Sequence, residues 1–220
     1  MAHMYIKFLK YVRETNWRED VASMNYLLTS TAWRQEHNGY SHQNPSFISG
    51  MLDKQNDFVK VYFPVDENTM LATMEETLSS KNQVNAIVAG KTPLLNWLSY
   101  KQAKKFLKEG LGIWDFASDT EPDIVLVGIG DYVTNEALAA IDILKKDMKE
   151  LKIRFVNILK LAANSQIPDV QKYLTTDKPV IVNFHGYPEV MKAILFNVKN
   201  SGRFYIHGYR ELGGTTTPFD

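Results

Sequence analysis

The sequence predicts an α/β protein made of two open, mostly parallel, three-layer α/β/α domains. Three observations indicate this fold class. Short apolar runs recur along the chain and have the length expected of buried strands. Segments with apolar residues at helical spacing lie between these runs. In the second half the two kinds of segment alternate regularly, which is the pattern of βαβ units and of a mostly parallel sheet.

Three strands are predicted in the first half, over residues 22–30, 58–63 and 85–89. We expect them to run in the same direction, so that the segments leaving their carboxyl ends emerge at one edge of the sheet. That edge is where open α/β sheets bind ligands, because strand ends and helix amino termini open a crevice there.

Four helices are predicted in the same half, one of them a short helix suggested by Phe47, Ile48, Met51 and Leu52. The first precedes the strands, with Ile6, Leu9 and Val12 on its apolar side. The last runs from residue 100 to 108 and is stopped by Gly110. The third helix starts after a cap at Asp66 or Asn68, and its apolar face is predicted to consist of Met70, Leu71, Met74 and Leu78.

The second half is predicted to contain strands at 124–129, 153–159, 180–184 and near 204–206. A helix capped at Thr134, a short helix at 170–174 and a helix through 194 and 198 lie between them. A polar, proline-containing stretch at 118–123 marks the predicted domain boundary, which gives domains 5–117 and 118–220. The second domain is expected to be truncated, because no closing helix follows residue 218.

Composition excludes several classes of partner. The chain has 220 residues, with 25 basic and 25 acidic side chains, and this balance argues against nucleic acid as its main partner. The sequence contains no cysteine, so it forms neither a disulfide nor a thiolate metal site, which suits a cytoplasmic protein. No apolar run approaches the length of a membrane span, and no membrane partner is expected.

The most polar loop, residues 33–45, directly follows the first predicted strand. It contains His37 and His42 among amides, a serine, an arginine and a glutamate, and this density of donors and acceptors predicts a polar ligand. The alternative is that both histidines only satisfy hydrogen bonds within a long loop. Their separation of five residues is not the spacing that places two zinc ligands on one helical face, so no metal site is predicted.

Lys91 follows the third predicted strand and should emerge at the same edge as that loop. It is either a solvated surface lysine or a point-charge ligand for phosphate. Residues 128–133 lie between a strand and a helix but lack the third glycine of the dinucleotide fingerprint, so a tight turn is a sufficient explanation. His185 and His207 lie near strand ends, and the sequence assigns them no role.

Residues 33–45, Trp-Arg-Gln-Glu-His-Asn-Gly-Tyr-Ser-His-Gln-Asn-Pro, closely resemble the signature loop of the phosphoketolases. These are thiamine-diphosphate enzymes that cleave xylulose 5-phosphate and fructose 6-phosphate. The resemblance extends from about Tyr5 to Asp220. The other segments that carry it follow in family order, at 17–18, 26–30, 90–91, 112–114, 175–180, 185–188 and 215–220.

The resemblance implies a fragment that joins part of a transketolase-like pyrimidine-binding domain to most of the carboxyl-terminal domain. Its parent would form acetyl phosphate and an aldose phosphate, with inorganic phosphate as co-substrate. The family residues that anchor thiamine diphosphate and Mg²⁺ match nothing in this chain. The isolated chain is therefore expected to be inactive, and its expected partners are the missing amino-terminal domain and a second copy in a homo-oligomer.

The site residues carry over from the family one by one. By resemblance, His37 and His42 are catalytic, while Gln35, Asn38 and Lys91 bind the substrate. Histidine suits proton transfer at near-neutral pH, and a lysine suits the charge of a phosphate. The alternative is a non-catalytic module that binds a sugar phosphate or a partner subunit. Reading the frame upstream of residue 5 would separate these two hypotheses.

Overall fold

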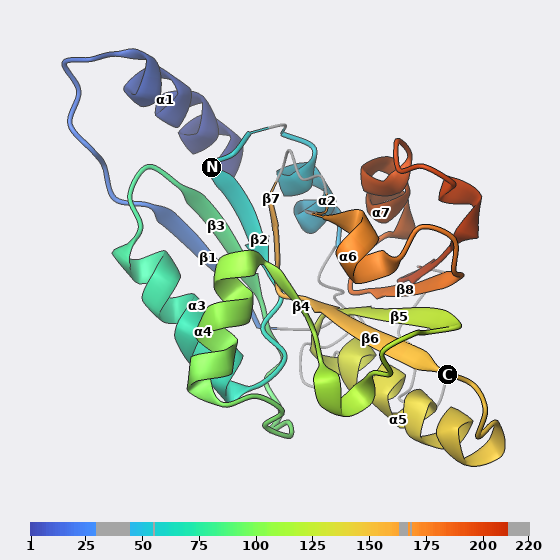
Figure 1. Cartoon of the computed structure of the whole chain (residues 1–220). Coiled ribbons are helices and arrows are strands. Elements are labelled where there is room, and N and C mark those ends of the chain that lie inside the picture. The colour runs from blue at the N-terminus through green and yellow to red at the C-terminus, as the bar shows by residue number, and fades with distance from the viewer. Residues whose placement is uncertain (30–44, 55, 163–166, 168, 211–220) are drawn as a thin grey trace.

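The computed structural model describes residues 1–29, 45–54, 56–162, 167 and 169–210. Two twisted sheets lie side by side, with helices packed against both of them (Figure 1). Among the described residues, no helix is both long enough and apolar enough to cross a membrane.

The first sheet confirms the parallel arrangement that the sequence predicts for its three strands. Its order is β1 (Met24–Leu28), β3 (Val84–Val88), β2 (Val59–Tyr62) and β7 (Lys160–Ala162). β3 pairs in parallel with β1 and with β2. β7 is an antiparallel edge strand that the sequence did not predict.

The second sheet contains the four strands predicted in the second half, and these four run parallel to one another. A short strand, which was not predicted, pairs with the first edge in antiparallel fashion. The order is β4 (Leu111–Ile113), β6 (Ile153–Ile158), β5 (Ile124–Ile129), β8 (Val180–Phe184) and β9 (Phe204–Gly208).

Each sheet takes one edge strand from the other half of the chain. β4 precedes the predicted boundary at residues 117 and 118, yet it belongs to the second sheet. β7 follows that boundary and belongs to the first sheet. The division into domains 5–117 and 118–220 stays a prediction. The exchange of edge strands means that each sheet contains a strand from the far side of the predicted boundary, which ties the two sheets together.

The helices agree with most of the predicted segments. The first buries Ile6, Leu9 and Val12, as predicted. The predicted stop at Gly110 is also confirmed, since this residue ends α4 with a left-handed φ of 85°. The seven α-helices of the described chain are α1 (Ala2–Glu14), α2 (Ser46–Leu52), α3 (Glu67–Ser79), α4 (Tyr100–Glu109), α5 (Asp131–Asp147), α6 (Val170–Leu174) and α7 (Pro188–Leu195).

The buried face of α3 differs from the prediction. Leu71 and Leu78 are exposed, whereas the fully buried residues are small or hydroxylated. Threonine can be buried here because its hydroxyl donates to the carbonyl one turn earlier, as Thr73 does to Thr69 at 2.8 Å. The fully buried residues of α3 are therefore Thr69, Ala72, Thr73 and Thr77, while Met70 and Met74 of the predicted face are partly buried and pack against the core.

The cap of α5 also differs from the prediction. The helix begins at Asp131, because Gly130 adopts a φ of 120° and turns the chain directly out of β5. Thr134, the predicted cap, lies one turn inside the helix and is fully buried. Its hydroxyl accepts a hydrogen bond of 3.0 Å from the amide nitrogen of Asn157 in β6.

Two apolar clusters form the core, and each of them contains residues of both sheets. Val61 and Val127 belong to one cluster, while Tyr62 and Leu126 belong to the other. Alternate residues of β2 and β5 therefore point to opposite faces that are both covered.

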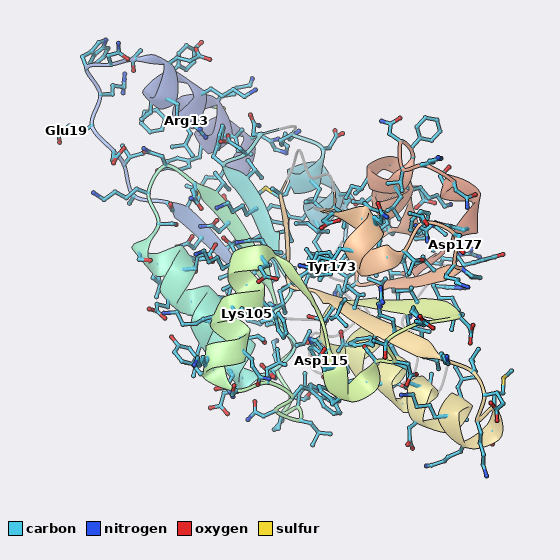
Figure 2. All side chains as sticks on the ribbon, in the orientation of Figure 1. Arg13, Glu19, Lys105, Asp115, Tyr173 and Asp177 are labelled. Carbon is cyan, nitrogen blue, oxygen red and sulfur yellow. The ribbon has the colours of Figure 1, made fainter. Side chains whose placement is uncertain are left out.

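Aromatic contacts link the two sheets further. The rings of Phe63 and Phe184 meet edge to face, with their centroids 5.7 Å apart. Tyr173 of α6 lies between the two halves (Figure 2), and its hydroxyl donates to the carboxylate of Glu109 at 3.1 Å. The sheets are thus packed as one unit, which fixes the relative positions of their carboxyl edges.

The corrected packing predicts opposite outcomes for one substitution on the two adjacent helices α3 and α4. Leu78→Ala should change the free energy of unfolding by less than about 0.5 kcal/mol, because Leu78 is 69% exposed. Leu107→Ala should lower it by about 2–5 kcal/mol, because Leu107 is 2% exposed. Urea unfolding of both variants measures the difference, and equal losses would contradict the packing described for α3.

Candidate functional site

Four of the five predicted site residues lie outside the described part of the chain. These are His37, His42, Gln35 and Asn38, all within residues 30–44. Lys91 is described, and it is exposed just beyond the carboxyl end of β3. The predicted meeting of the two histidines with Lys91 therefore stays a prediction.

The strand register places Lys91 at the edge that the sequence predicted. Leu28 of β1 pairs with Val88 of β3, so both strands end side by side. The backbone N–H of Ala89 then donates to the carbonyl of Leu28 at 3.0 Å, which extends the pairing by one residue. The chain therefore leaves β1 and β3 at adjacent positions on one edge of the first sheet.

The residues on either side of Lys91 are held by the second sheet. The backbone N–H of Gly90 donates to a carboxylate oxygen of Asp131, the first residue of α5, at 2.7 Å. The hydroxyls of Thr92 and Tyr132 are hydrogen-bonded to each other. A Cβ at position 90 would lie 2.8 Å from the same carboxylate oxygen, so glycine permits this close approach.

Asp131 lies beside a histidine from the next strand. Asp131 and His185 are 2% and 3% exposed, and they follow the carboxyl ends of β5 and β8. His185 Nδ1 is 3.9 Å from Asp131 Oδ1, which also accepts the backbone N–H of Tyr132 at 2.8 Å. A Cβ at Gly130 would lie 2.5 Å from that of His185, so only a glycine allows the two strand ends to meet this closely.

Burial shifts the pKa of both members of this pair. It lowers the pKa of His185 from 6.5 to about 4, so the imidazole is neutral at pH 7. Burial also raises the pKa of Asp131, while the hydrogen bonds from the N–H groups of Tyr132 and Gly90 act in the opposite direction. At neutral pH the 3.9 Å contact is therefore not an ion pair, and the carboxylate depends on backbone amides for its stabilisation.

Sequence reasoning assigned no role to Asp131 or His185. The tight strand-to-helix turn predicted at residues 128–133 is present, and it aims Asp131 into the space between the sheets. The partner of Asp131 lies 41 residues earlier in the chain, and nothing in the local pattern points to it. A buried-strand pattern followed by Gly-Asp was the only available signal.

The described residues contain no group of three or more His, Cys, Asp or Glu side chains that could hold a metal ion. The two buried carboxylates at the carboxyl edges are already committed to backbone amides. Asp66, which follows β2, accepts from the N–H groups of Thr69, Trp97 and Leu98 at 2.7–3.0 Å. Both oxygens of Asp131 also accept backbone N–H groups.

Two family models match the chain. The model described as D-xylulose 5-phosphate/D-fructose 6-phosphate phosphoketolase matches residues 1–80, and the model described as XFP C-terminal domain matches residues 91–220. Among curated proteins, the chain is 44% identical over 232 residues to "Probable phosphoketolase 2" of Nostoc sp.. It is 43% identical to "Probable phosphoketolase" of Gloeobacter violaceus. Each match covers 100% of the chain and 29% of the relative.

Solved structures of transketolases share the fold. A transketolase mutant from Pichia stipitis has a TM-score of 0.66 at 14% identity, over 86% of this chain and 26% of that one. The transketolase from Campylobacter jejuni has a TM-score of 0.62 at 15% identity, over 90% and 28% of the two chains. At these identities the likeness shows the fold alone, and it confirms the predicted α/β class with transketolase-like sheets.

The buried histidine predicts a pH dependence of stability. Between pH 6.5 and about 4 the unfolded chain binds a proton at His185 that the folded chain does not, so the free energy of unfolding should fall as the pH falls through this range. The loss from this residue amounts to about 3 kcal/mol at most. In His185→Gln this part of the dependence should disappear.

Urea unfolding at several pH values between 4 and 7 measures this effect. The control is His207→Gln, at an exposed residue. In this variant the change in the free energy of unfolding across the pH range should stay close to that of the parent protein. Identical profiles for His185→Gln and the parent protein would contradict a neutral, buried imidazole.

Proposed function

Because the chain belongs to the phosphoketolase family, we propose that it forms the substrate-facing part of a phosphoketolase. Such an enzyme cleaves xylulose 5-phosphate or fructose 6-phosphate with inorganic phosphate and releases acetyl phosphate and an aldose phosphate. The supporting observation is the match of the whole chain to phosphoketolases, combined with a lysine that follows a fixed backbone at the carboxyl edge of a parallel sheet.

The chain spans 29% of the length of the curated relatives that it matches. The remaining parts of an active enzyme must therefore come from residues outside this stretch, on the same polypeptide or on another. Exposed aromatic residues on and after α1 are consistent with contact to another part of such an enzyme or to a second copy of it: Tyr11 is 65% exposed and Trp17 is 76% exposed. A cytoplasmic location stays a prediction.

Membership of the family implies dependence on thiamine diphosphate, which phosphoketolases use together with Mg²⁺. The described residues do not fit an anchor for the diphosphate or the metal. Mg²⁺ prefers carboxylate and other oxygen ligands, and the buried carboxylates of Asp66 and Asp131 already accept backbone amides. We therefore propose that residues outside this chain hold both groups, and that the 220 residues alone do not turn over substrate.

The chain's own contribution is to bind and orient the sugar phosphate and to move protons. Lys91 supplies a positive charge for the substrate's phosphate, and the loop with Gln35 and Asn38 supplies hydrogen bonds to its hydroxyls. His37 and His42 donate and accept protons during carbon–carbon cleavage and the later loss of water, because imidazole titrates near neutral pH. These roles rest on the family resemblance and, for Lys91, on its position.

A phosphoketolase assay tests the proposal. The 220-residue chain alone, given thiamine diphosphate, Mg²⁺, phosphate and xylulose 5-phosphate, should produce no acetyl phosphate. A hybrid in which this chain replaces the matching stretch of the Nostoc relative should produce acetyl phosphate. Its rate should lie within about tenfold of the rate of that relative, which is a small difference compared with the range of typical kcat values.

Two outcomes would overturn parts of the proposal. Turnover by the chain alone would refute the claim that other residues hold the cofactor. A folded, cofactor-loaded hybrid without acetyl phosphate formation would refute the enzymatic role, and sugar-phosphate binding by that hybrid would then favour the non-catalytic module.

Substitution of single residues tests the site. In the active hybrid, Lys91→Ala and His37→Ala should each lower kcat/KM by about 10²-fold, because they remove a charge and a proton carrier from the transition state. Lys105→Ala is the control: it removes a similar exposed charge from α4, on a helix outside the edge that holds Lys91 (Figure 2). Equal rates for Lys91→Ala and Lys105→Ala would return Lys91 to the role of a solvated surface residue.

A further inference from the structure

We propose that Asp131 is a positioning residue, which fixes the Gly90–Thr92 segment through the backbone and thereby sets the place of Lys91 at the carboxyl edge. This inference rests on the proposed function for the role of Lys91 itself. It adds that the second sheet takes part in substrate binding indirectly, through a carboxylate that does not touch the substrate.

The position of Asp131 follows from the topology of the second sheet. The chain leaves β5 for β6 on one side and later returns to β8 on the other side of β5. Such a reversal opens a crevice at the carboxyl ends of the two diverging connections, and in open α/β sheets this crevice is the usual ligand site. Asp131 follows β5 and His185 follows β8, so both lie at this switch point in the strand order.

In this protein a segment that follows a strand of the first sheet lies at the switch point. The N–H of Gly90 donates there to Asp131 Oδ2 at 2.7 Å. The carboxylate and the amide are close enough that a side chain at position 90 would meet the same oxygen at 2.8 Å. The usual ligand position is thus taken by the backbone immediately before Lys91.

Lys91 is held from both sides. Gly90, which precedes it, contacts Asp131, and Thr92, which follows it, contacts Tyr132. Asp131 and Tyr132 are neighbours at the start of α5, a helix of 17 residues that packs on β5. A rigid helix start therefore fixes the backbone on either side of Lys91, while the lysine itself stays exposed at the edge.

The chemistry of the contact requires a carboxylate. Asp131 serves two backbone donors at once, since Oδ2 accepts from Gly90 and Oδ1 accepts from Tyr132. An asparagine has one acceptor oxygen and an NH₂ group that donates, so it can serve only one of these N–H groups. The amide of residue 132 is adjacent in the chain and remains in reach, so the long-range contact to Gly90 is the one that Asp131→Asn should lose.

Hydrogen exchange of the Gly90 amide in the 220-residue chain tests the inference without reference to activity. Asp131→Asn should accelerate this exchange by about tenfold or more relative to the parent chain, because the amide loses its acceptor. Amides in the middle of β3 should keep their protection. Tyr132→Phe removes only the second contact, and it should accelerate exchange near Thr92 while Asp131 is intact.

Asp119→Asn is the matched control. Asp119 also accepts a backbone N–H, that of Ile153 at 2.9 Å. This bond lies at the amino end of β6, which is the opposite end of the second sheet from Asp131. If Gly90 exchange is unchanged in Asp131→Asn, or if it rises as much in Asp119→Asn, the proposed contact does not hold the segment and the inference falls.

The kinetic consequence is measured in the active hybrid enzyme. Asp131→Asn should raise KM for xylulose 5-phosphate by about fivefold or more with a smaller change in kcat, because a displaced lysine weakens substrate binding. Lys91→Ala should cost less in this background than in the parent enzyme, since both changes disturb the same charge. A loss of kcat alone, with fully additive effects, would indicate a merely structural role and would overturn the inference.

The exchange and kinetic results separate two failures. If the parent hybrid is inactive, the proposed function fails, and the exchange of the Gly90 amide still decides whether Asp131 fixes the segment. If the hybrid is active and the exchange does not respond to Asp131→Asn, the proposed function stands and only the positioning role is lost.

Discussion

The hydrogen bond between the Gly90 amide and the Asp131 carboxylate is the constraint on which the site depends. A buried carboxylate is costly unless donors satisfy it, and Asp131 obtains one of its two recorded donors from the other sheet. Separation of the sheets at this point would leave a buried carboxyl oxygen without its donor. The second sheet therefore favours the conformation in which the segment around Lys91 lies against it.

The rest of the fold maintains the geometry of that contact. β4 and β7 are exchanged between the sheets, and both core clusters run through the two of them. Lys160 of β7 forms an ion pair with Glu76 of α3 at 3.1 Å, and Tyr62 of β2 donates to the same carboxylate at 2.9 Å. Interfaces of this kind resist sliding, because packed side chains have few alternative arrangements. The carboxyl edges of the two sheets consequently keep their positions relative to each other.

Local patterns predicted the elements that carry a strong local signal. Strands such as 124–129 and 180–184 are continuous apolar runs, and the structure has them with the same bounds. β4 and β7 have only three residues each, too few for a period, so they depend on tertiary pairing. The predicted face of α3 was wrong at Leu71 and Leu78, which are exposed. It missed the buried threonines because the hydropathy of threonine does not show that its hydroxyl is satisfied within the helix. Strand direction placed Lys91 at an edge, whereas the pairing of Gly90 with Asp131 spans 41 residues and leaves no local trace.

The candidate groups at the edges of the two sheets differ in burial, and we infer different roles for them. At the carboxyl edge of the second sheet, His185 is buried and its pKa is lowered to about 4, so its imidazole is neutral near pH 7. Asp131 is equally enclosed and serves backbone amides. The geometry assigns Asp131 the task of holding the segment before Lys91 in place. Lys91 is exposed at the edge of the first sheet, and the chemistry we propose therefore belongs to that edge, with the second sheet as its support.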